Sequence, residues 1–468
     1  GRAGLSVFYL ELKRGLDILC SHKHADRDRI AVTGLSGGGW QTIVISSLDT
    51  RVKLAAPNAG YCALGPRIEY RADTGDLEQN PTDLVSVADY VHLTALLAPR
   101  PALLIYNAKD DCCFPADRAL ASVYWPVVPV YKLFERGESP AASDVERFAN
   151  HVNHDPGTHN YLKDNREAFY RFINRHFMPA EKRIDEDLPV ENEIRSSAAL
   201  AISYPPDNAN FHTLAADLMR SLPTSKPPAS DGKAMDRWRE GTRKALREVV
   251  RSESDLAVDP KPVNVAGFSD VVKGVAGRAS ALRLGDRWTL PVVVYERKGA
   301  RTDRTVLTIT DRGMADARDI VAEALGRGER AVVLDILFTG DCVPPRGAGH
   351  WAQMIGTVGR RPLGIQVSQL RAVAEWIERG QTGKPLRVVT KGRVAGLAAL
   401  VCAALYPQSF DSLELREMDK SLKDLAASKV TYISSPSLFC FGLLAVADIP
   451  ELLHLAHPTK VNMQHTER

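Results

Sequence analysis

The sequence predicts an α/β protein whose mostly parallel sheets carry helices on both faces. Short apolar, β-branched runs alternate with segments of helical periodicity along most of the 468 residues, which is typical of parallel sheets covered on both faces. A Gly-rich turn joins one such run to a helix at residues 34–38. The same rhythm returns from about residue 282, which indicates a second domain.

The first part of the chain is predicted to contain four strands and four helices. The apolar runs predict strands at residues 29–36, 52–60, 101–108 and 128–135. Helical periodicity predicts helices at residues 5–22, 38–48, 89–97 and 165–177. Asp89 begins the third of these helices and is predicted to be its N-cap.

The later part of the chain begins with a polar stretch rich in Pro and Ser, and its α/β pattern then resumes. We expect three regions: a catalytic domain at residues 1–180, a linker with peripheral helices at 181–265, and a second domain at 266–468. In the second domain the pattern predicts strands at 288–297, 304–310, 331–338 and 386–392 and helices at 317–328 and 368–380.

The two domains resemble each other in sequence, which predicts a tandem duplication. The segment RIAVTGLSGGG superposes on RVVTKGRVAGL with Gly34 on Gly392, an offset of 358, so that Val394 takes the place of Ser36. Farther along, VADYVHLTALLAP matches VADIPELLHLAHP with an offset of 359. Two independent matches that agree to within one residue favour a repeat.

Composition excludes several classes of function. Hydrophobic residues make up 44%, charged residues 25%, and the net charge is +3, so no nucleic-acid or membrane partner is predicted. The most apolar segments, 394–405 and 438–447, are too short to span a bilayer and are expected to be buried. Seven cysteines without a C-x-x-C pair indicate neither a zinc site nor a disulfide framework. We expect no cofactor and no metal.

Ser36 is the predicted nucleophile. Gly34-Leu35-Ser36-Gly37-Gly38 fits G-x-S-x-G, the sharp strand-to-helix turn that lifts a serine above a sheet. Glycine two residues away on either side permits this strained turn. The N–H of Gly37, at the start of the helix, is placed to stabilise an oxyanion. A phosphate loop is the alternative, but no lysine follows the glycines.

The predicted acid follows the strand at residues 101–108. Asp110 is our choice and Asp111 the alternative, because both emerge at the carboxyl end of a strand, where such sheets place their chemistry. Cys112 and Cys113 come next and are expected to pack as small apolar residues, although a vicinal disulfide is conceivable.

The predicted base is His159, in the turn-forming segment DPGTHNY just before the last helix. This position gives the chain order Ser, Asp, His of the α/β sheet hydrolases. His151 and His154 share the loop and are the rivals, whereas His176 lies inside the helix. In the expected mechanism His159 accepts the Ser36 proton, the acid fixes the imidazole tautomer, and an acyl-enzyme forms that water hydrolyses.

These motifs together resemble the acetyl xylan esterase and dienelactone-hydrolase-like branch of the α/β-hydrolases. In particular they resemble large tandem bacterial proteins of the acetyl xylan esterase or prolyl-oligopeptidase-like kind. The resemblance rests on GLSGGGWQT, YNAKDDCCF and DPGTHNYLKDNRE, and it covers residues 1–180 best. It implies an α/β-hydrolase fold, removal of acetyl or similar groups from a carbohydrate, and a periplasmic or secreted location, although the sequence itself leaves the compartment unknown.

The chain departs from the family's pattern. A complete domain has about four strands and an oxyanion loop before the elbow strand, whereas only 28 residues precede Arg29. We therefore expect a fragment cut at both ends, with the second oxyanion donor upstream of residue 1 and the elbow strand at a sheet edge. The second domain is expected to be degenerate, without a nucleophile, and to pack on the first. A rival arrangement joins the strand at Val306 to that at Ala31 in one continuous sheet.

The function predicted is thus a serine carboxylic-ester hydrolase acting on a small-molecule or carbohydrate ester. A peptidase of the prolyl-oligopeptidase kind is the alternative, and a catalytically incomplete binding or scaffold protein is a third reading.

Overall fold

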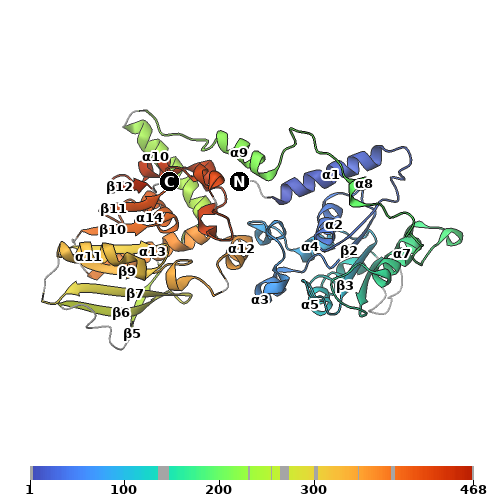
Figure 1. Ribbon diagram of the computed structural model, residues 1–468, viewed down its shortest axis with the longest axis horizontal. Coiled ribbons are helices and arrows are strands. Elements are labelled where there is room, and N and C mark those ends of the chain that lie inside the picture. Colours follow the sequence, from blue (N-terminus) through green and yellow to red (C-terminus); the bar gives the residue numbers. More distant parts are fainter. Residues whose placement is uncertain are drawn as a thin grey trace. The chain divides into compact units, whose positions relative to one another are not determined.

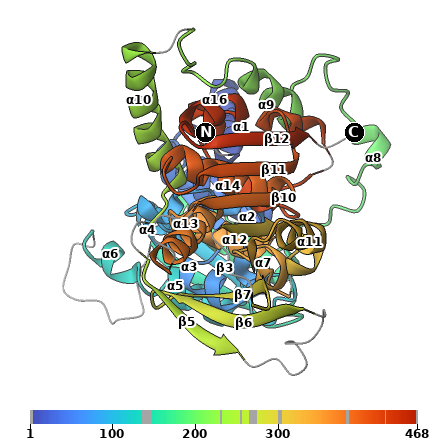
Figure 2. The same ribbon diagram turned by 90° about the vertical axis from the view of Figure 1, so that its left-hand side faces the viewer.

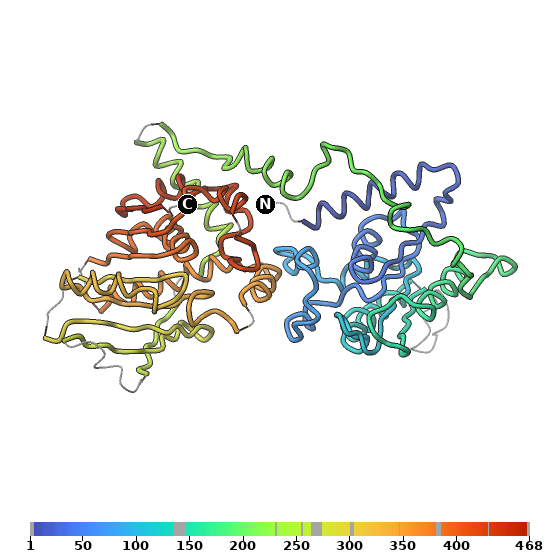
Figure 3. The backbone as a smooth tube through the Cα atoms, viewed as in Figure 1, coloured from blue at the N-terminus to red at the C-terminus, as the bar shows by residue number. Residues whose placement is uncertain are grey.

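The computed structural model describes residues 4–134, 147–229, 232–253, 256–263, 274–299, 304–345, 347–380, 385–428 and 430–465. These residues form two compact units (Figures 1 and 3). The N-terminal unit comprises Arg2–Pro206 with Gly356–Gly359, and the C-terminal unit comprises Asp207–Ile355 with Arg360–Arg468. Each unit has its own sheet. The boundary expected between residues 265 and 266 lies outside the described residues.

The N-terminal unit alternates strands with helices. Its elements are α1 (Leu5–Ser21), β1 (Ala31–Leu35), α2 (Gly37–Leu48), β2 (Leu54–Asn58), α3 (Leu64–Glu69), α4 (Tyr90–Ala95), β3 (Ala102–Asn107), α5 (Ala116–Val123), α6 (Val128–Lys132), β4 (Phe148–Asn153), α7 (Lys163–Phe177) and α8 (Ser197–Leu200). Asp89 caps α4 by accepting from the Tyr90 N–H, which confirms its predicted role.

The four strands of the N-terminal unit form one parallel sheet in the order β1-β2-β3-β4. Because all four run the same way, their carboxyl ends, each followed by a loop, meet at one edge of the sheet. This edge is where parallel sheets place ligands and chemistry.

Alternation along the strands sends neighbouring side chains to opposite faces of this sheet. Leu104 of β3 joins a core cluster that also contains Trp40 of α2 and Ala119 of α5. Its neighbour Leu103 joins a second cluster with Phe172 of α7. Helices thus cover both faces, as the sequence predicts.

The strand predicted at residues 128–135 is wrong. Residues Val128–Lys132 form the short helix α6, and residue 135 lies outside the described part. Pro129 stands in the first turn of this helix, where its missing N–H costs nothing. Val128 and Tyr131, three residues apart, are the side chains it buries. The fourth strand is β4, a run of Phe, Ala, Asn, His and Val that reads as polar in sequence.

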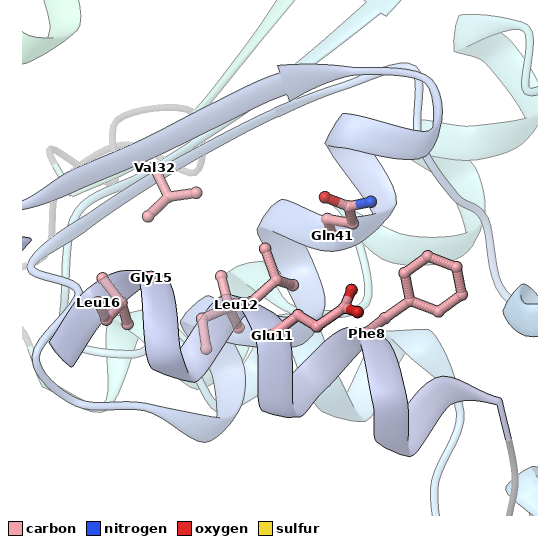
Figure 4. Close-up of a pocket in the computed structure, with 8 residues that line it drawn as sticks. Phe8, Glu11, Leu12, Gly15, Leu16, Val32 and Gln41 are labelled. Carbon is pink, nitrogen blue, oxygen red and sulfur yellow. The ribbon is translucent and has the colours of Figure 1, made fainter. Parts of the chain in front are cut away.

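Strand β1 lies at the edge of the sheet, as expected, with β2 as its partner among the described residues. A groove of about 420 Å³ runs between α1, β1 and α2. Figure 4 shows Phe8, Glu11 and Leu12 of α1 facing Val32 of β1 and Gln41 of α2 across it. Neither Ser36 nor the predicted acid and base lines this groove.

The C-terminal unit has a larger sheet. Its elements are α9 (Phe211–Arg220), α10 (Lys233–Val250), β5 (Val258–Val263), β6 (Val275–Leu284), β7 (Trp288–Arg297), β8 (Thr305–Thr310), α11 (Arg318–Gly326), β9 (Arg330–Leu334), α12 (Gly349–Thr357), α13 (Pro362–Gly380), β10 (Leu386–Lys391), α14 (Arg393–Leu405), β11 (Ser412–Met418), α15 (Leu443–Val446), α16 (Ile449–Leu455) and β12 (Lys460–His465).

The eight strands of this unit follow the order β12-β11-β10-β8-β9-β7-β6-β5. Figure 2 shows β12, β11 and β10 next to one another, with β7, β6 and β5 farther along the sheet. The first five are parallel, and β7, β6 and β5 continue the sheet with antiparallel pairing. Val388 of β10 packs in a cluster with α13 and α14, whereas Val389 packs in another with α11. The alternative prediction, one continuous sheet shared by the two units, is wrong, because β8 pairs with β9 and β10 rather than with β1.

The two units share local detail at the positions that the repeat aligns. Asp448 caps α16 with a capping box, as Asp89 caps α4. Both carboxylates also accept a backbone N–H from a distant loop, at Leu422 and Leu64 respectively. These likenesses support the duplication, which stays a prediction. No described helix combines the length and apolar character that crossing a bilayer requires.

Candidate active site

Ser36 occupies the sharp turn between β1 and α2. Its backbone angles, φ 59° and ψ −119°, lie in a region that non-glycine residues rarely adopt. The turn brings the preceding strand so close to the helix that a Cβ on Gly34 would lie 2.6 Å from the Gly38 carbonyl carbon. A Cβ on Gly38 would meet nothing within 4 Å. The elbow therefore needs its first glycine for space, and the motif's second glycine is spatially free.

The elbow is tied to the end of β2. The Ser36 N–H donates to the Asn58 carbonyl at 2.9 Å. The first turn of α2 also lies against β2, because a Cβ on Gly39 would come within 2.4 Å of the same carbonyl oxygen. Gly39 is therefore a third glycine on which the elbow depends, and the sequence motif does not include it.

Asp110 and His159 face each other across two loops. The imidazole Nδ1 lies 2.9 and 3.0 Å from the two carboxylate oxygens of Asp110. Asp111 instead accepts the backbone N–H of His159 at 2.8 Å. The structure thus separates the two candidates that the sequence leaves open, since Asp110 holds the ring and Asp111 holds the loop.

Hydrogen bonding sets the charge of this pair. Burial tends to raise the pKa of Asp110, but hydrogen bonds from His159, from the Cys113 and Cys112 N–H groups and from Asn107 outweigh it and lower that pKa. The hydrogen bond to Asp110 raises the pKa of His159 above its usual value, and burial offsets only part of the rise. The arrangement stabilises an ionised acid beside an imidazole that readily takes up a proton.

The loop that carries His159 contacts the elbow strand β1 and its neighbour β2. The Asn58 amide, whose backbone holds Ser36, donates its Nδ2–H to the Asn160 carbonyl at 3.1 Å. The Thr33 and Tyr161 hydroxyl groups lie 2.5 Å apart. The two residues that follow His159 thus contact the elbow strand and its neighbour β2. Among the described residues Ser36 Oγ makes no hydrogen bond to His159; such contacts often form only when substrate binds.

Buried asparagines frame the acid and the base. Strands β2, β3 and β4 end in Asn58, Asn107 and Asn153, and each of these residues is at most 1% exposed. The Asn107 amide donates to the Asp110 carboxylate at 3.2 Å. Asn160, next to His159, donates to the Asn153 amide oxygen at 3.0 Å. The sequence does not reveal these buried asparagines, because asparagine at the end of a strand is typical of an ordinary turn.

A buried carboxylate supports the loop that follows the acid. Phe114 has a positive φ of 59°, and its N–H donates to Asp73 at 3.2 Å. Asp73 is fully buried and pairs with the Arg118 guanidinium through bonds of 2.7 and 3.0 Å. Asp73 thereby fixes the far end of the segment that carries Asp110. The stretch around Asp73 is polar in sequence and gives no sign that this carboxylate is buried.

The rival histidines lie elsewhere. His151 Nε2 is 2.8 Å from Asp164 Oδ2, at the start of α7. His154 is exposed. His176 lies inside α7, as expected, with its ring 4.6 Å from that of Phe172. None of them is hydrogen-bonded to Asp110 in the described part of the chain.

The counterpart of the elbow in the C-terminal unit is closed by a carboxylate. Val394 stands in the first turn of α14, where the repeat aligns it with Ser36. Asp311, just after β8, accepts the N–H groups of Val394 and Ala395 at 3.1 and 2.8 Å. Burial raises the pKa of Asp311, and these backbone bonds oppose the rise. The helix N-terminus that would hold an oxyanion here is thus occupied by the protein's own side chain.

One family model and several solved structures are similar to parts of this chain. Residues 6–80 match the family model of acetyl xylan esterase (AXE1). A candidate acetyl xylan esterase from Bacteroides fragilis has a TM-score of 0.43 at 12% identity, over 56% of this chain and 77% of that one. A glucuronoyl esterase from Solibacter usitatus gives 0.39 at 12%, over 50% and 76%. An acetyl xylan esterase from Paenibacillus sp. R4 gives 0.32 at 11%, over 53% and 93%. No curated protein sequence matches the chain.

The matched segment 6–80 contains Ser36, its glycines and Asn58. The match and the parallel sheet with its elbow identify the N-terminal unit as an α/β-hydrolase of the carboxylic-ester hydrolase class that resembles the acetyl xylan esterases.

Proposed function

We propose, from this resemblance, that the N-terminal unit is a serine esterase whose triad is Ser36, Asp110 and His159. The observation that carries the proposal is the pair of hydrogen bonds from the His159 ring to Asp110, in a loop that also contacts the support of the Ser36 elbow. A nucleophile at a strained turn, a base and an orienting acid are the parts that acyl transfer requires.

In the proposed reaction the imidazole of His159 takes the Ser36 proton as Oγ attacks the ester carbonyl. The Gly37 N–H, at the N-terminus of α2, stabilises the oxyanion. Collapse of the tetrahedral intermediate expels the alcohol, which receives the proton from His159, and leaves an acyl-enzyme. Water then attacks with the same base, releasing the carboxylic acid and regenerating the Ser36 hydroxyl.

We propose acetylated carbohydrate as the substrate class. The family model matched by residues 6–80 is that of acetyl xylan esterase. The acyl group of an acetyl ester is small, so it requires only a small pocket beside the elbow.

The test uses the full chain with Ser36→Ala. We expect turnover of p-nitrophenyl acetate and release of acetate from acetylated xylan to fall at least about 10³-fold, because the nucleophile is gone. A fluorophosphonate should label Ser36 in the parent and leave the variant unlabelled. Cleavage of a Gly-Pro amide at a rate rivalling the ester would instead favour the peptidase alternative. Undiminished ester turnover in the variant would refute the assignment.

We propose that the C-terminal unit is catalytically inert. Val394 offers no nucleophile, and Asp311 fills the amide N–H positions that an oxyanion would need. The sequence predicts a degenerate second domain, and these two structural features support that prediction.

A further inference from the structure

Two cysteines and the proposed base form a compact group at the carboxyl edge of the N-terminal sheet. One donor atom from each of Cys112, Cys113 and His159 lies within 4.8 Å of the other two. Among the residues that the structure describes, this is the one group of three His, Cys, Asp or Glu side chains placed so closely. The two sulfur atoms are 3.6 Å apart. Cys112 is exposed, so the group can be reached from solvent.

Hydrogen bonds within the protein already hold Cys112, Cys113 and His159 in place without a bound ion. Asp110 Oδ1 accepts the N–H groups of Cys112 and Cys113 at 3.0 and 2.9 Å, which folds the two cysteines into a tight turn. The same carboxylate holds the His159 ring, and Asp111 holds the His159 backbone. Donor atoms fixed in advance lower the cost of ordering them around a ligand.

The donor set selects the kind of ion. Two thiolate sulfurs and one imidazole nitrogen suit zinc and other soft or borderline ions, whereas magnesium and calcium prefer oxygen. Zinc takes tetrahedral sites, and three protein ligands leave its fourth position to water. The sequence predicts no metal, because it lacks the C-x-x-C spacing that is typical of zinc sites. The third ligand here lies 46 residues beyond Cys113 in the chain.

We propose that Cys112, Cys113 and His159 form a reversible Zn²⁺ site that switches the hydrolase off by capturing its base. Coordination releases the two thiol protons to solvent and forms two Zn–S bonds and one Zn–N bond. If the ion takes Nε2, it occupies the lone pair that accepts the Ser36 proton. If it takes Nδ1, it displaces Asp110 and the tautomer is lost. Either geometry stops proton transfer. The inhibition rests on the proposed function, whereas the binding does not.

Binding is tested on the full chain without a histidine tag, reduced with a phosphine. We expect Co²⁺, as a visible probe, to bind once per chain with thiolate charge-transfer absorption, and Zn²⁺ to displace it. Affinity should fall at least about tenfold in Cys112→Ala/Cys113→Ala and in His159→Asn. Cys20→Ala and His154→Ala, which alter a cysteine on α1 and an exposed histidine of the base loop, should bind as the parent does. Absent thiolate absorption, or unchanged affinity in the double variant, would overturn the site.

Inhibition is tested by p-nitrophenyl acetate turnover, each variant being compared with its own rate in EDTA. Zn²⁺ should inhibit the parent, EDTA should restore it, and the double cysteine variant should require at least about tenfold more zinc. Binding that leaves turnover unchanged would overturn the switch. If no form hydrolyses esters while the spectroscopic site persists, the proposed function fails and the metal site stands.

Discussion

At the scale of single residues, Asp110 connects most of the proposed chemistry. One carboxylate accepts the His159 ring, the Asn107 amide and two backbone N–H groups. It therefore sets the orientation of the base, the charge of the base and the shape of its own loop at once.

Replacing Asp110 by Asn should separate these roles. We expect kcat to fall about 10³–10⁴-fold, because the imidazole loses its orienting carboxylate. The neutral imidazole is the active form, so activity rises with pH through the pKa of His159. The carboxylate raises that pKa, so the acid limb of kcat/KM should move to lower pH in the variant. Both profiles are measured in EDTA.

Asp111→Asn is the matched control, since Asp111 accepts only the backbone N–H of His159 among the described contacts. It should lower activity modestly and move the acid limb less than Asp110→Asn does, because the Asp111 charge contributes less than Asp110 to the raised pKa of His159. An unchanged limb in the Asp110 variant would contradict the proposed acid.

The three proposed catalytic residues can be predicted from the sequence, whereas the residues that hold them in place cannot. Ser36, Asp110 and His159 follow from a motif, a strand end and chain order. Asp110 and Asp111 cannot be separated from sequence, because both carboxylates follow the same strand and only the three-dimensional loop decides which meets the ring. Asp73 escapes notice because it accepts from Phe114, 41 residues away. Asn107 escapes notice because it follows a strand like an ordinary turn residue, and its partner Asn165 lies 58 residues away.

At the scale of elements, the elbow is a close contact between strand and helix. The sequence motif treats its two glycines alike, whereas the structure crowds Gly34 and leaves Gly38 open.

A matched pair of alanine variants tests this asymmetry. Gly34→Ala should lower the free energy of unfolding by about 1–3 kcal/mol, because its methyl group collides with backbone that cannot move aside. Gly38→Ala should be neutral or stabilising by up to about 1 kcal/mol, since Gly38 lies in helix α2. Thermal unfolding midpoints decide between them. Equal losses would show that the crowding at Gly34 is relieved by movement.

The loop after β3 depends on Asp73. Asp73→Asn should destabilise the protein by about 1–3 kcal/mol, because it leaves the Arg118 guanidinium without its buried anion. It should also lower kcat by up to about 10²-fold through displacement of the acid, with KM little changed. Asp117→Asn, on the exposed face of the same helix, is the control and should change neither. Full kcat in the Asp73 variant would show that the loop holds its shape alone.

The elements with strong patterns are predicted correctly, and the failures have physical causes. Strand β4 is missed because its half-buried position at the sheet edge tolerates polar side chains. Helix α6 is taken for a strand because a five-residue helix is too short to show a period. Strands β5 and β6 are missed, since β5 carries two prolines and is largely exposed. Tertiary pairing, rather than local pattern, makes these segments strands.

At the scale of the whole molecule, one elbow carries a serine and the other does not. In the C-terminal unit Val394 stands where the N-terminal unit has the serine. The Asp311 carboxylate accepts the backbone N–H groups of Val394 and Ala395, where an oxyanion would otherwise bind.

Restoring the missing serine should therefore fail to restore chemistry. The variant Ser36→Ala/Val394→Ser should be as inactive on p-nitrophenyl acetate as Ser36→Ala alone, because Asp311 still holds the amide N–H groups of α14. Unfolding midpoints near those of Ser36→Ala would show that the protein is intact. Ester turnover above that of the single variant would contradict the inert assignment.

The division into two α/β units is visible in the sequence, because the alternation of strand and helix stops and resumes. The sheets themselves are not, since whether β8 joins β1 or β10 depends on pairing between strands that local sequence does not encode.

The row of amides at the ends of β2, β3 and β4 has one more consequence. Asn58, Asn107 and Asn153 carry no ionisable group. Asn107 and Asn153 donate to Asp110 and Asp164, whose pKa values are lowered by hydrogen bonds, so mild acid that charges His159 leaves these bonds intact. The strand ends should therefore keep their positions while His159 becomes protonated. Loss of turnover in mild acid should then be a reversible titration, recovered at once on neutralisation, rather than an unfolding event.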